Sequence, residues 1–124
     1  MTSGPGSRRG VEPVHSRTTF AELRTGATRG RNGPLTVAFV AHPEWDRSQV
    51  AYAVNRRVGN AVTRNLLRRR LRSIIVERAP DLPVGAYVVR GGEEAPALTF
   101  DQLKVAMSQA LDQATRRSAA RAAR

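Results

Sequence analysis

The chain has 124 residues, of which 40% are hydrophobic, so it can build one folded domain with a modest core but not two. Lysine and arginine number 21 against 10 acidic residues, a net charge of +11. A domain this basic typically binds a polyanion, either nucleic acid or a membrane surface. The absence of cysteine excludes disulfides, thiolate catalysis and cysteine-based zinc sites. No signal segment and no long apolar run occurs, which predicts a soluble, cytoplasmic protein.

The positive charge comes almost entirely from arginine, because Lys104 is the only lysine. A guanidinium binds phosphate through two parallel hydrogen bonds and stacks on bases, so this bias fits RNA or DNA as the partner. It fits a GC-rich genome equally well. Composition alone leaves both explanations open.

The first half of the chain predicts a leader, a short helix and a basic loop. Residues 1–13 are rich in Gly, Ser, Pro and Arg, which is typical of a flexible basic leader. TTFAELRTG predicts a short helix with Thr18 or Thr19 as its N-cap and Gly26 as its end. The next segment, ATRGRNGP, has the composition of a turn-rich loop.

Apolar and β-branched runs then predict three strands, and two further helices complete the chain. The strands are expected at 35–42, at 49–55, antiparallel to the first, and at 85–90. A long helix should begin after Asn60 and end near Pro80, and a last helix should begin after Thr99. The final RRSAARAAR is expected to fray.

This order, α-β-β-α-β-α, predicts a single α/β (α+β) domain in which helices pack on one mixed sheet. We expect the domain to span residues 14–118, with a basic tail at 119–124.

The segment VGNAVTRNLLRRRLR at 58–72 concentrates arginine without any acidic residue. On a helix, the predicted core face consists of Val62, Leu66, Leu67, Leu71, Ile74 and Ile75. Cations one turn apart, with Asn65 and Arg69 beside them, are predicted on the opposite side: Arg64, Arg68 and Arg72. Such a stripe repels itself unless an anion binds, so we interpret it as a phosphate-binding surface. Arg70 points toward the apolar side, and its stem should lie along the core edge.

Two other interpretations of this helix stand beside the phosphate-binding one. A one-sided basic face could simply be solvated and aid solubility. A basic amphipathic helix is also typical of membrane-surface or calmodulin-target segments. The apolar face is needed to cover the sheet and has no aromatic anchor, which disfavours the membrane interpretation.

RRVGNAVTRN followed by LLRRRLR resembles the signature of the protein subunit of bacterial ribonuclease P. The positions that match are Arg56, Arg57, Val58, Gly59, Asn60, Ala61, Val62, Arg64, Asn65, Arg69 and Arg72. Arg68 replaces the usual lysine, Leu66 stands where the family usually has arginine, and Ser73 replaces a frequent acidic residue. The resemblance implies the same α-β-β-α-β-α order with a left-handed β-α-β crossover.

The resemblance also implies a function in which the protein assists a catalytic RNA. That RNA would carry the Mg²⁺-dependent active site that removes the 5′ leader from precursor tRNA, so the protein would hold no catalytic residue, metal or cofactor. The implied partners are the catalytic RNA and precursor tRNA, with no membrane and no protein partner. The residues implied to face the catalytic RNA are Arg56, Arg57, Asn60, Arg64, Asn65, Arg68, Arg69 and Arg72. The implied leader cleft, between the sheet and the first helix, is lined by Phe20, Tyr52 and Val54 with Arg17 nearby.

Some alternatives stay open at this point. Phe20 and Tyr52 could be ordinary core residues. A non-catalytic structural RNA-binding protein of ribosomal or nucleoid type would have the same size and charge. An independent enzyme could use HPEWD, where His42, Glu44 and Asp46 imitate a metal or acid–base site, although such a turn is more often solvated.

Overall fold

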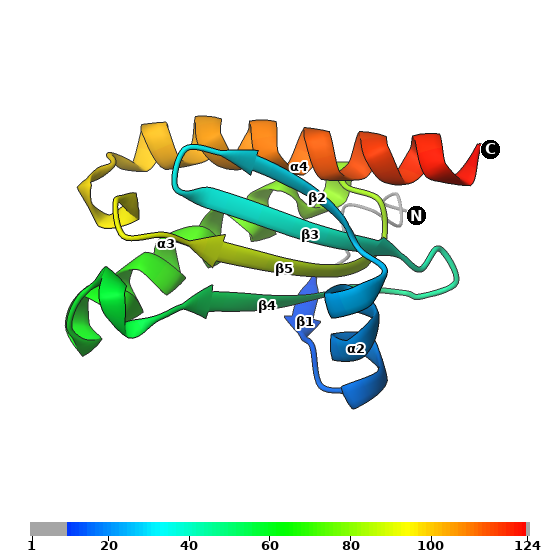
Figure 1. Cartoon of the computed structure of the whole chain (residues 1–124), viewed down its shortest axis with the longest axis horizontal. Helices are drawn as coiled ribbons and strands as arrows, with labels where there is room; N and C mark the ends of the chain where they lie inside the picture. Colours follow the sequence, from blue (N-terminus) through cyan, green and yellow to red (C-terminus); the bar gives the residue numbers. More distant parts are fainter. Residues whose placement is uncertain (1–9, 124) are drawn as a thin grey trace, which may run out of the picture.

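The computed structural model describes residues 10–123, and Figure 1 shows their arrangement. The elements in chain order are β1 (Val11–Pro13), α2 (Arg17–Thr25), β2 (Thr28–Asn32), β3 (Leu35–Ala41), β4 (Ser48–Val54), α3 (Ala61–Arg78), β5 (Gly85–Gly91) and α4 (Phe100–Ala122). Short 3-10 turns lie at Arg56–Val58, Ala79–Asp81 and Ala95–Ala97.

The strands form one mixed sheet in the order β1-β4-β5-β3-β2. β5 is parallel to β4 and antiparallel to β3, β2 is antiparallel to β3, and β1 is parallel to β4. Helices α3 and α4 cover one face and α2 lies on the other (Figure 1). In that view β4 and β5 both point left, with β5 above β4 and α3 behind them, which makes the crossover left-handed. The predicted α+β fold is therefore confirmed, and the six predicted elements occur in the predicted order, with β1 and β2 as additional strands.

The core lies between the sheet and the two long helices. Strand residues that alternate toward the helices are fully buried, among them Leu35, Val37 and Phe39 of β3. The helices contribute Leu67, Leu71, Ile74 and Ile75 from α3 and Leu103, Met107 and Leu111 from α4. Each such side chain contributes roughly 1.5–3 kcal/mol by leaving water. A smaller cluster under α2 includes Leu23, Ala27, Ala38 and Ala86.

Two strands were missed by the sequence interpretation. Val11–Pro13, expected in a flexible leader, pair with Ser48–Val50 as β1, while residues 1–9 of that predicted leader lie outside the described residues. The predicted loop contains β2, whose arginine-rich sequence concealed a strand. The predicted strands at 35–42 and 49–55 do run in opposite directions, but they do not pair, because β5 lies between them.

The ends of two helices also differ from expectation. Ser16, and not Thr18 or Thr19, caps α2, and its hydroxyl accepts hydrogen bonds from the amides of both threonines. The C-terminal segment expected to fray remains helical through Ala122. Arg117 donates to the Arg29 carbonyl and Arg121 to the Gly26 carbonyl, and these bonds to the β2 region hold the last turns of the helix.

Helix α3 is rotated about its axis relative to the predicted core face. Val62 is 77% exposed and Leu66 is 43% exposed, so neither belongs to the core. The buried stripe of α3 is therefore narrower than the predicted one and consists of Leu67, Leu71, Ile74 and Ile75. Arg64 and Arg68, predicted to point away from the core, are half-buried instead.

His42 connects the turn after β3 to helix α2. Its Nε2 lies 2.9 Å from Glu22 Oε1 and its Nδ1 lies 3.0 Å from Glu44 Oε2. The Trp45 ring stacks on the imidazole with centroids 4.0 Å apart. Within the part of the chain that is described, no cluster of His, Cys, Asp or Glu is arranged to hold a metal. The geometry therefore indicates a structural clamp and not the metal or acid–base site that HPEWD could have formed.

The close approach of α4 to β2 depends on Gly30. A Cβ at this position would clash with the Ala110 carbonyl oxygen and lie 2.7 Å from Gln113 Cβ. We expect Gly30→Ala to lower the free energy of unfolding by about 1–3 kcal/mol, as overpacking does. Gly10→Ala is the control, because nothing lies within 4 Å of a Cβ there. Equal urea midpoints for the two variants would contradict this packing.

The His42 clamp should make stability depend on pH. Burial disfavours the imidazolium, but the hydrogen bonds to Glu44 and Glu22 outweigh it and raise the pKa of His42. A neutral ring has one N–H and can donate to only one carboxylate. The stabilisation is therefore present at low pH and lost as the pH rises through the raised pKa.

We expect His42→Gln to reduce the free energy of unfolding more at about pH 5.5 than at about pH 8.5. Urea titrations of the wild type and the variant at both pH values measure this difference. Asp46→Asn, a change in the same turn, is the control. If the difference in the free energy of unfolding between the wild type and His42→Gln stayed constant or grew with pH, a charged His42 could not be the source of the stabilisation.

Candidate nucleic-acid interface

Two asparagines shape the chain before α3. The Asn55 side chain accepts a hydrogen bond of 2.9 Å from the Arg57 amide, and the Asn60 side chain accepts one of 2.9 Å from the Thr63 amide. Gly59 joins the two capped turns with a φ of 153°, a conformation that disfavours a side chain. This arrangement holds Arg56 and Arg57 on an exposed turn. The predicted cap at Asn60 is confirmed.

The prediction that the arginines at 64, 68 and 72 lie opposite the core is wrong. They lie along the flank of α3 beside β4. Arg68 donates to Asn65 Oδ1 at 2.8 Å and to the Val54 carbonyl at 3.4 Å. Arg64 has a buried Nε without a hydrogen-bond partner. Arg72 is exposed and lies near Tyr52. The flank therefore presents cations at the edge of the sheet.

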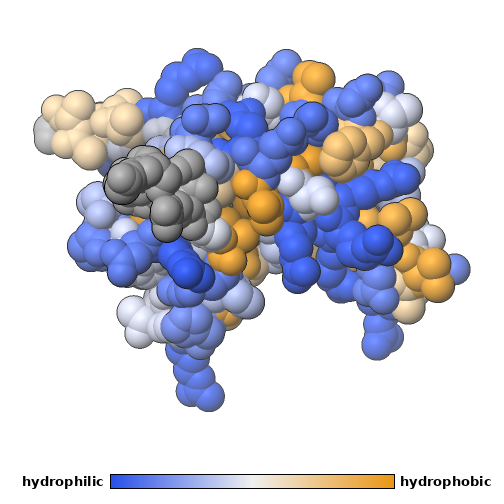
Figure 2. Space-filling view, turned by 180° about the vertical axis from the view of Figure 1, so that it is seen from behind, coloured by the Kyte–Doolittle hydropathy of each residue, from blue (hydrophilic) through white to orange (hydrophobic). Residues whose placement is uncertain are grey.

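The outer face of α3 mixes apolar and basic residues. Val62, Leu66 and Val76 are exposed, and Arg69 lies on the same side. Seen from behind the sheet, hydrophobic patches lie between hydrophilic side chains (Figure 2). Half-buried Arg70 lines a shallow depression with Leu66, Ser73 and Phe100, which agrees with the prediction that its stem lies along the core edge.

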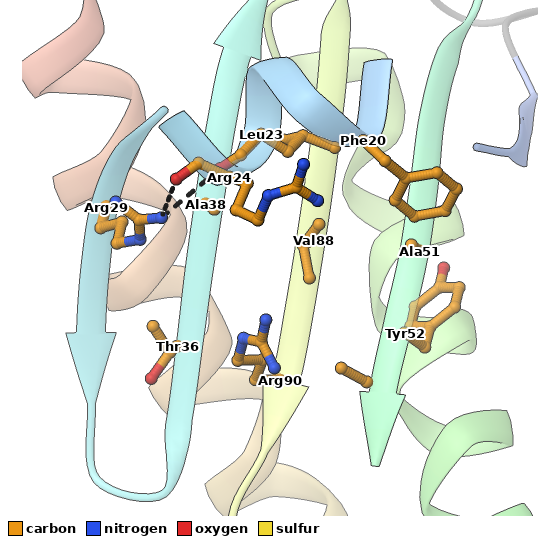
Figure 3. A pocket seen from close by; sticks show the side chains of 11 residues that line it. Phe20, Leu23, Arg24, Arg29, Thr36, Ala38, Ala51, Tyr52, Val88 and Arg90 are labelled. Carbon is orange, nitrogen blue, oxygen red and sulfur yellow. Dashed lines mark hydrogen bonds between the residues drawn. The ribbon is translucent and has the colours of Figure 1, made fainter. Parts of the chain in front are cut away.

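The open face of the sheet carries a groove of about 380 Å³ beside α2. Its floor consists of small side chains from three strands: Thr36, Ala38, Ala51, Ala53 and Val88. Figure 3 shows Arg24 and Arg90 pointing into the space above this floor, Arg29 on the β2 side, and Phe20 and Tyr52 on the β4 side. The small side chains create the hollow, and the larger ones form its rim.

A second depression of about 610 Å³ continues the groove toward the start of α3. It shares Thr36, Tyr52, Ala53 and Arg90 with the first. Arg31 and Arg68 add two further cations, and Glu94 is the one carboxylate among its lining residues in the described part of the chain. The two depressions form a continuous positive track, which we call the open-face groove.

The predicted cleft residues are partly brought together. Phe20 is 42% exposed at the rim, so it is not a core residue. Tyr52 is half-buried and lines both depressions, and burial raises its pKa to about 12 although the charge of Arg72 opposes this. Val54 is buried and reaches only the second depression. Arg17, predicted nearby, is exposed in the first turn of α2 and lines neither depression.

Sequence reasoning missed the arginines that surround the groove: Arg24, Arg29, Arg31 and Arg90. One signal was available for two of them. Arg29 and Arg31 alternate with Thr28 and Gly30, which is the pattern of a strand with one basic face. Arg90 could not be assigned, because the other arginines of the groove belong to other elements of the fold.

Among residues 10–123, no helix has both the length and the apolar character needed to cross a bilayer. The described chain therefore contains no helical membrane span.

Residues 11–115 match the family model described as Ribonuclease P. The ribonuclease P protein component of Thermobifida fusca is 35% identical over 101 residues, covering 76% of this chain and 69% of that protein. That of Kocuria rhizophila is 36% identical over 107 residues, covering 86% and 90% respectively.

Solved structures show the same fold. The RNase P protein of Staphylococcus aureus superposes with a TM-score of 0.72 at 19% identity, covering 81% of this chain and 92% of that one. The RNase P protein of Thermotoga maritima superposes with a TM-score of 0.69 at 23% identity, covering 85% and 96%. With a family match that extends from β1 into α4 and relatives above 30% identity, the chain belongs to the ribonuclease P protein family.

Proposed function

We propose that this protein acts as the protein component of ribonuclease P and uses two surfaces. The turn before α3 and α3 itself bind the catalytic RNA, and the open-face groove binds the 5′ leader of precursor tRNA. The observation that carries this proposal is the positive groove on the open face of a sheet in a chain that belongs to this family.

The groove has the properties that a single strand of arbitrary sequence requires. The exposed Phe20 ring offers a stacking surface for any base, and arginines along the rim can hold phosphates. The small floor residues leave room for the strand. The Tyr52 hydroxyl is buried on the side of β4 where Val50 and Arg72 lie, so we assign it no hydrogen bond to the strand.

The residues proposed to face the catalytic RNA have distinct geometric roles. Arg56, Arg57, Arg69 and Arg72 are exposed and can contact phosphates directly. The Asn60 and Asn65 side-chain oxygens are engaged within the protein, which leaves their amide N–H groups as donors. Arg68 lies where the flank of α3 meets the groove, and Arg64 lies one helical turn before it, so the pair can contact RNA near the junction of the two surfaces.

The chemistry itself is proposed to reside in the RNA. Catalysis by the protein would need a positioned base or a metal, and His42 is committed to its two glutamates. We therefore assign the Mg²⁺ requirement to the catalytic RNA and no cofactor to the protein. A purely structural RNA-binding protein would not need a groove of this shape next to the capped arginine turn.

Reconstitution tests this division of labour. We expect no cleavage of precursor tRNA by the protein alone at any Mg²⁺ concentration. Added to a bacterial ribonuclease P RNA, it should restore accurate leader removal at a low Mg²⁺ concentration at which the RNA alone is slow. Gel analysis of the 5′ ends measures both results. Accurate processing by RNA-free protein would contradict the proposal.

Two arginines should separate the two surfaces. Arg90→Ala removes a cation from the groove and should weaken precursor tRNA binding by the holoenzyme by about 1–3 kcal/mol, typical of a charge-assisted hydrogen bond. Arg69→Ala removes one from the outer face of α3 and should weaken binding of the catalytic RNA by a similar amount. Each variant should leave the other affinity within about twofold, a difference below about 0.5 kcal/mol.

Arg70→Leu is the control for loss of charge, because Arg70 lies at the core edge beside Phe100. It should change neither affinity by more than about threefold. Binding isotherms at one fixed salt concentration give all of these values. If Arg90→Ala and Arg69→Ala weakened both affinities equally, the assignment of separate surfaces would be wrong.

A further inference from the structure

The last two turns of α4 lie beyond the part of the chain that matches the family model. The match ends at residue 115, whereas the helix continues through Ala122. This extension carries Arg116, Arg117 and Arg121. Its position against the rest of the fold shows what these arginines can do.

Two of these arginines converge with Arg29 around the C-terminal end of α2. The Arg117 guanidinium donates to the Arg29 carbonyl, and Arg121 Nη1 donates to the Gly26 carbonyl at 2.7 Å. Arg29 Nη2 lies 3.4 Å from the Leu23 carbonyl and 3.3 Å from the Arg24 carbonyl (Figure 3). Each guanidinium is oriented by these bonds and keeps further N–H groups for another acceptor.

These arginines line a depression of about 320 Å³ together with Ala27, Thr28 and Ala120. No acidic residue is among its lining residues in the described chain. The nearest carboxylates in sequence are engaged elsewhere, Asp112 with Arg78 at 3.8 Å and Glu22 with His42. The depression therefore has the charge of an anion site without an anionic group of its own.

The depression adjoins the open-face groove at a single shared residue. Arg29 lines both, as part of the rim of the groove on one side and of this depression on the other. The opposite end of the groove lies at Asn55 and Arg68, next to the surface proposed for the catalytic RNA. The C-terminal end of α4 thus lies at the end of the groove that is farther from the surface proposed for the catalytic RNA.

We infer that Arg117 and Arg121, with Arg29, form a phosphate-binding extension of the groove for the part of the leader farthest from the cleavage site. This inference rests on the proposed function. A strand whose cleaved end lies at the catalytic RNA and which follows the groove past Phe20 reaches this depression next. Arginine forks that backbone carbonyls already orient lose little freedom when a phosphate binds.

A structural role is the competing explanation, because these arginines also cap the carbonyls at the end of α2. Capping predicts an effect on stability that is independent of RNA. A leader contact predicts an effect that appears only when the leader is long enough to reach the depression. The dependence on leader length separates the two.

The experiment uses the full chain reconstituted with a bacterial ribonuclease P RNA. Precursor tRNAs with leaders from about 4 to about 16 nucleotides cover the range of single-strand site sizes. Affinity is measured for the wild type and for the double variant Arg117→Gln/Arg121→Gln. Arg116→Gln is the matched control, since it removes a charge from the same helix turn but does not line the depression. Thermal midpoints are recorded for all variants.

We expect the double variant to bind precursors with the shortest leaders as tightly as the wild type does. For the longest leaders its affinity should fall about five- to twentyfold, because charge-assisted contacts are lost. Arg116→Gln should lose less than about twofold at every length. Arg117→Lys/Arg121→Lys, which keeps the charge, should recover part of the loss. This pattern would hold even if the thermal midpoint of the double variant fell, because the short-leader complex reports folded protein.

Four results would overturn the inference. An equal loss at all leader lengths would show a role in folding or general charge. If the double variant lost no affinity at any leader length while Arg90→Ala still weakened binding, the extension would be wrong and the proposed function would still hold. Weaker binding of the catalytic RNA in the absence of precursor would assign these arginines to that RNA. If the wild type itself gained no affinity from any leader, the proposed leader groove would fail, and the extension with it.

Discussion

Large side chains cover one face of the five-stranded sheet completely and the other face only in part, and this asymmetry determines where the binding surface lies. Along β3, Leu35, Val37 and Phe39 point toward the long helices and are buried, while Thr36 and Ala38 point to the other face. The large residues exclude water and hold α3 and α4 in place. The small ones cannot fill the space beside α2, so a groove remains. A packed core and a binding surface thus arise from opposite sides of the same strands.

Backbone carbonyls make the high density of arginine tolerable. Arg68 donates to the Val54 carbonyl, Arg29 to carbonyls at the end of α2, and Arg117 to the carbonyl of Arg29. The partial negative charge of these oxygens offsets some of the repulsion between neighbouring cations and fixes the direction of each fork. The protein needs no carboxylate beside each arginine, and the surface stays positive for RNA.

Much of the fold followed from local patterns. Asn60 and Thr99 as helix caps, the apolar runs that became β3, β4 and β5, and the order of the elements are all properties of short segments, which sequence periodicity reports directly. β1 and β2 were not predictable in the same way. β1 has only three residues and forms because it pairs with β4. β2 is rich in arginine and glycine and forms because it pairs with β3 and α4 packs closely against it.

The sequence by itself determined that the protein is basic, that an arginine-rich helix begins at a capped turn, and to which family it belongs. Only the tertiary structure decided which arginines share a surface. Arg29 and Arg90 line one groove because β2 and β5 lie on either side of β3 in the sheet, and Arg117 reaches Arg29 because α4 packs against β2. Helical periodicity also misplaced Leu66, since a residue on an apolar stripe is buried only where another element covers it. The spacing of residues along one helix or strand is a local property. Whether a side chain is buried, and which distant residues share a surface with it, depends on how all the elements pack together.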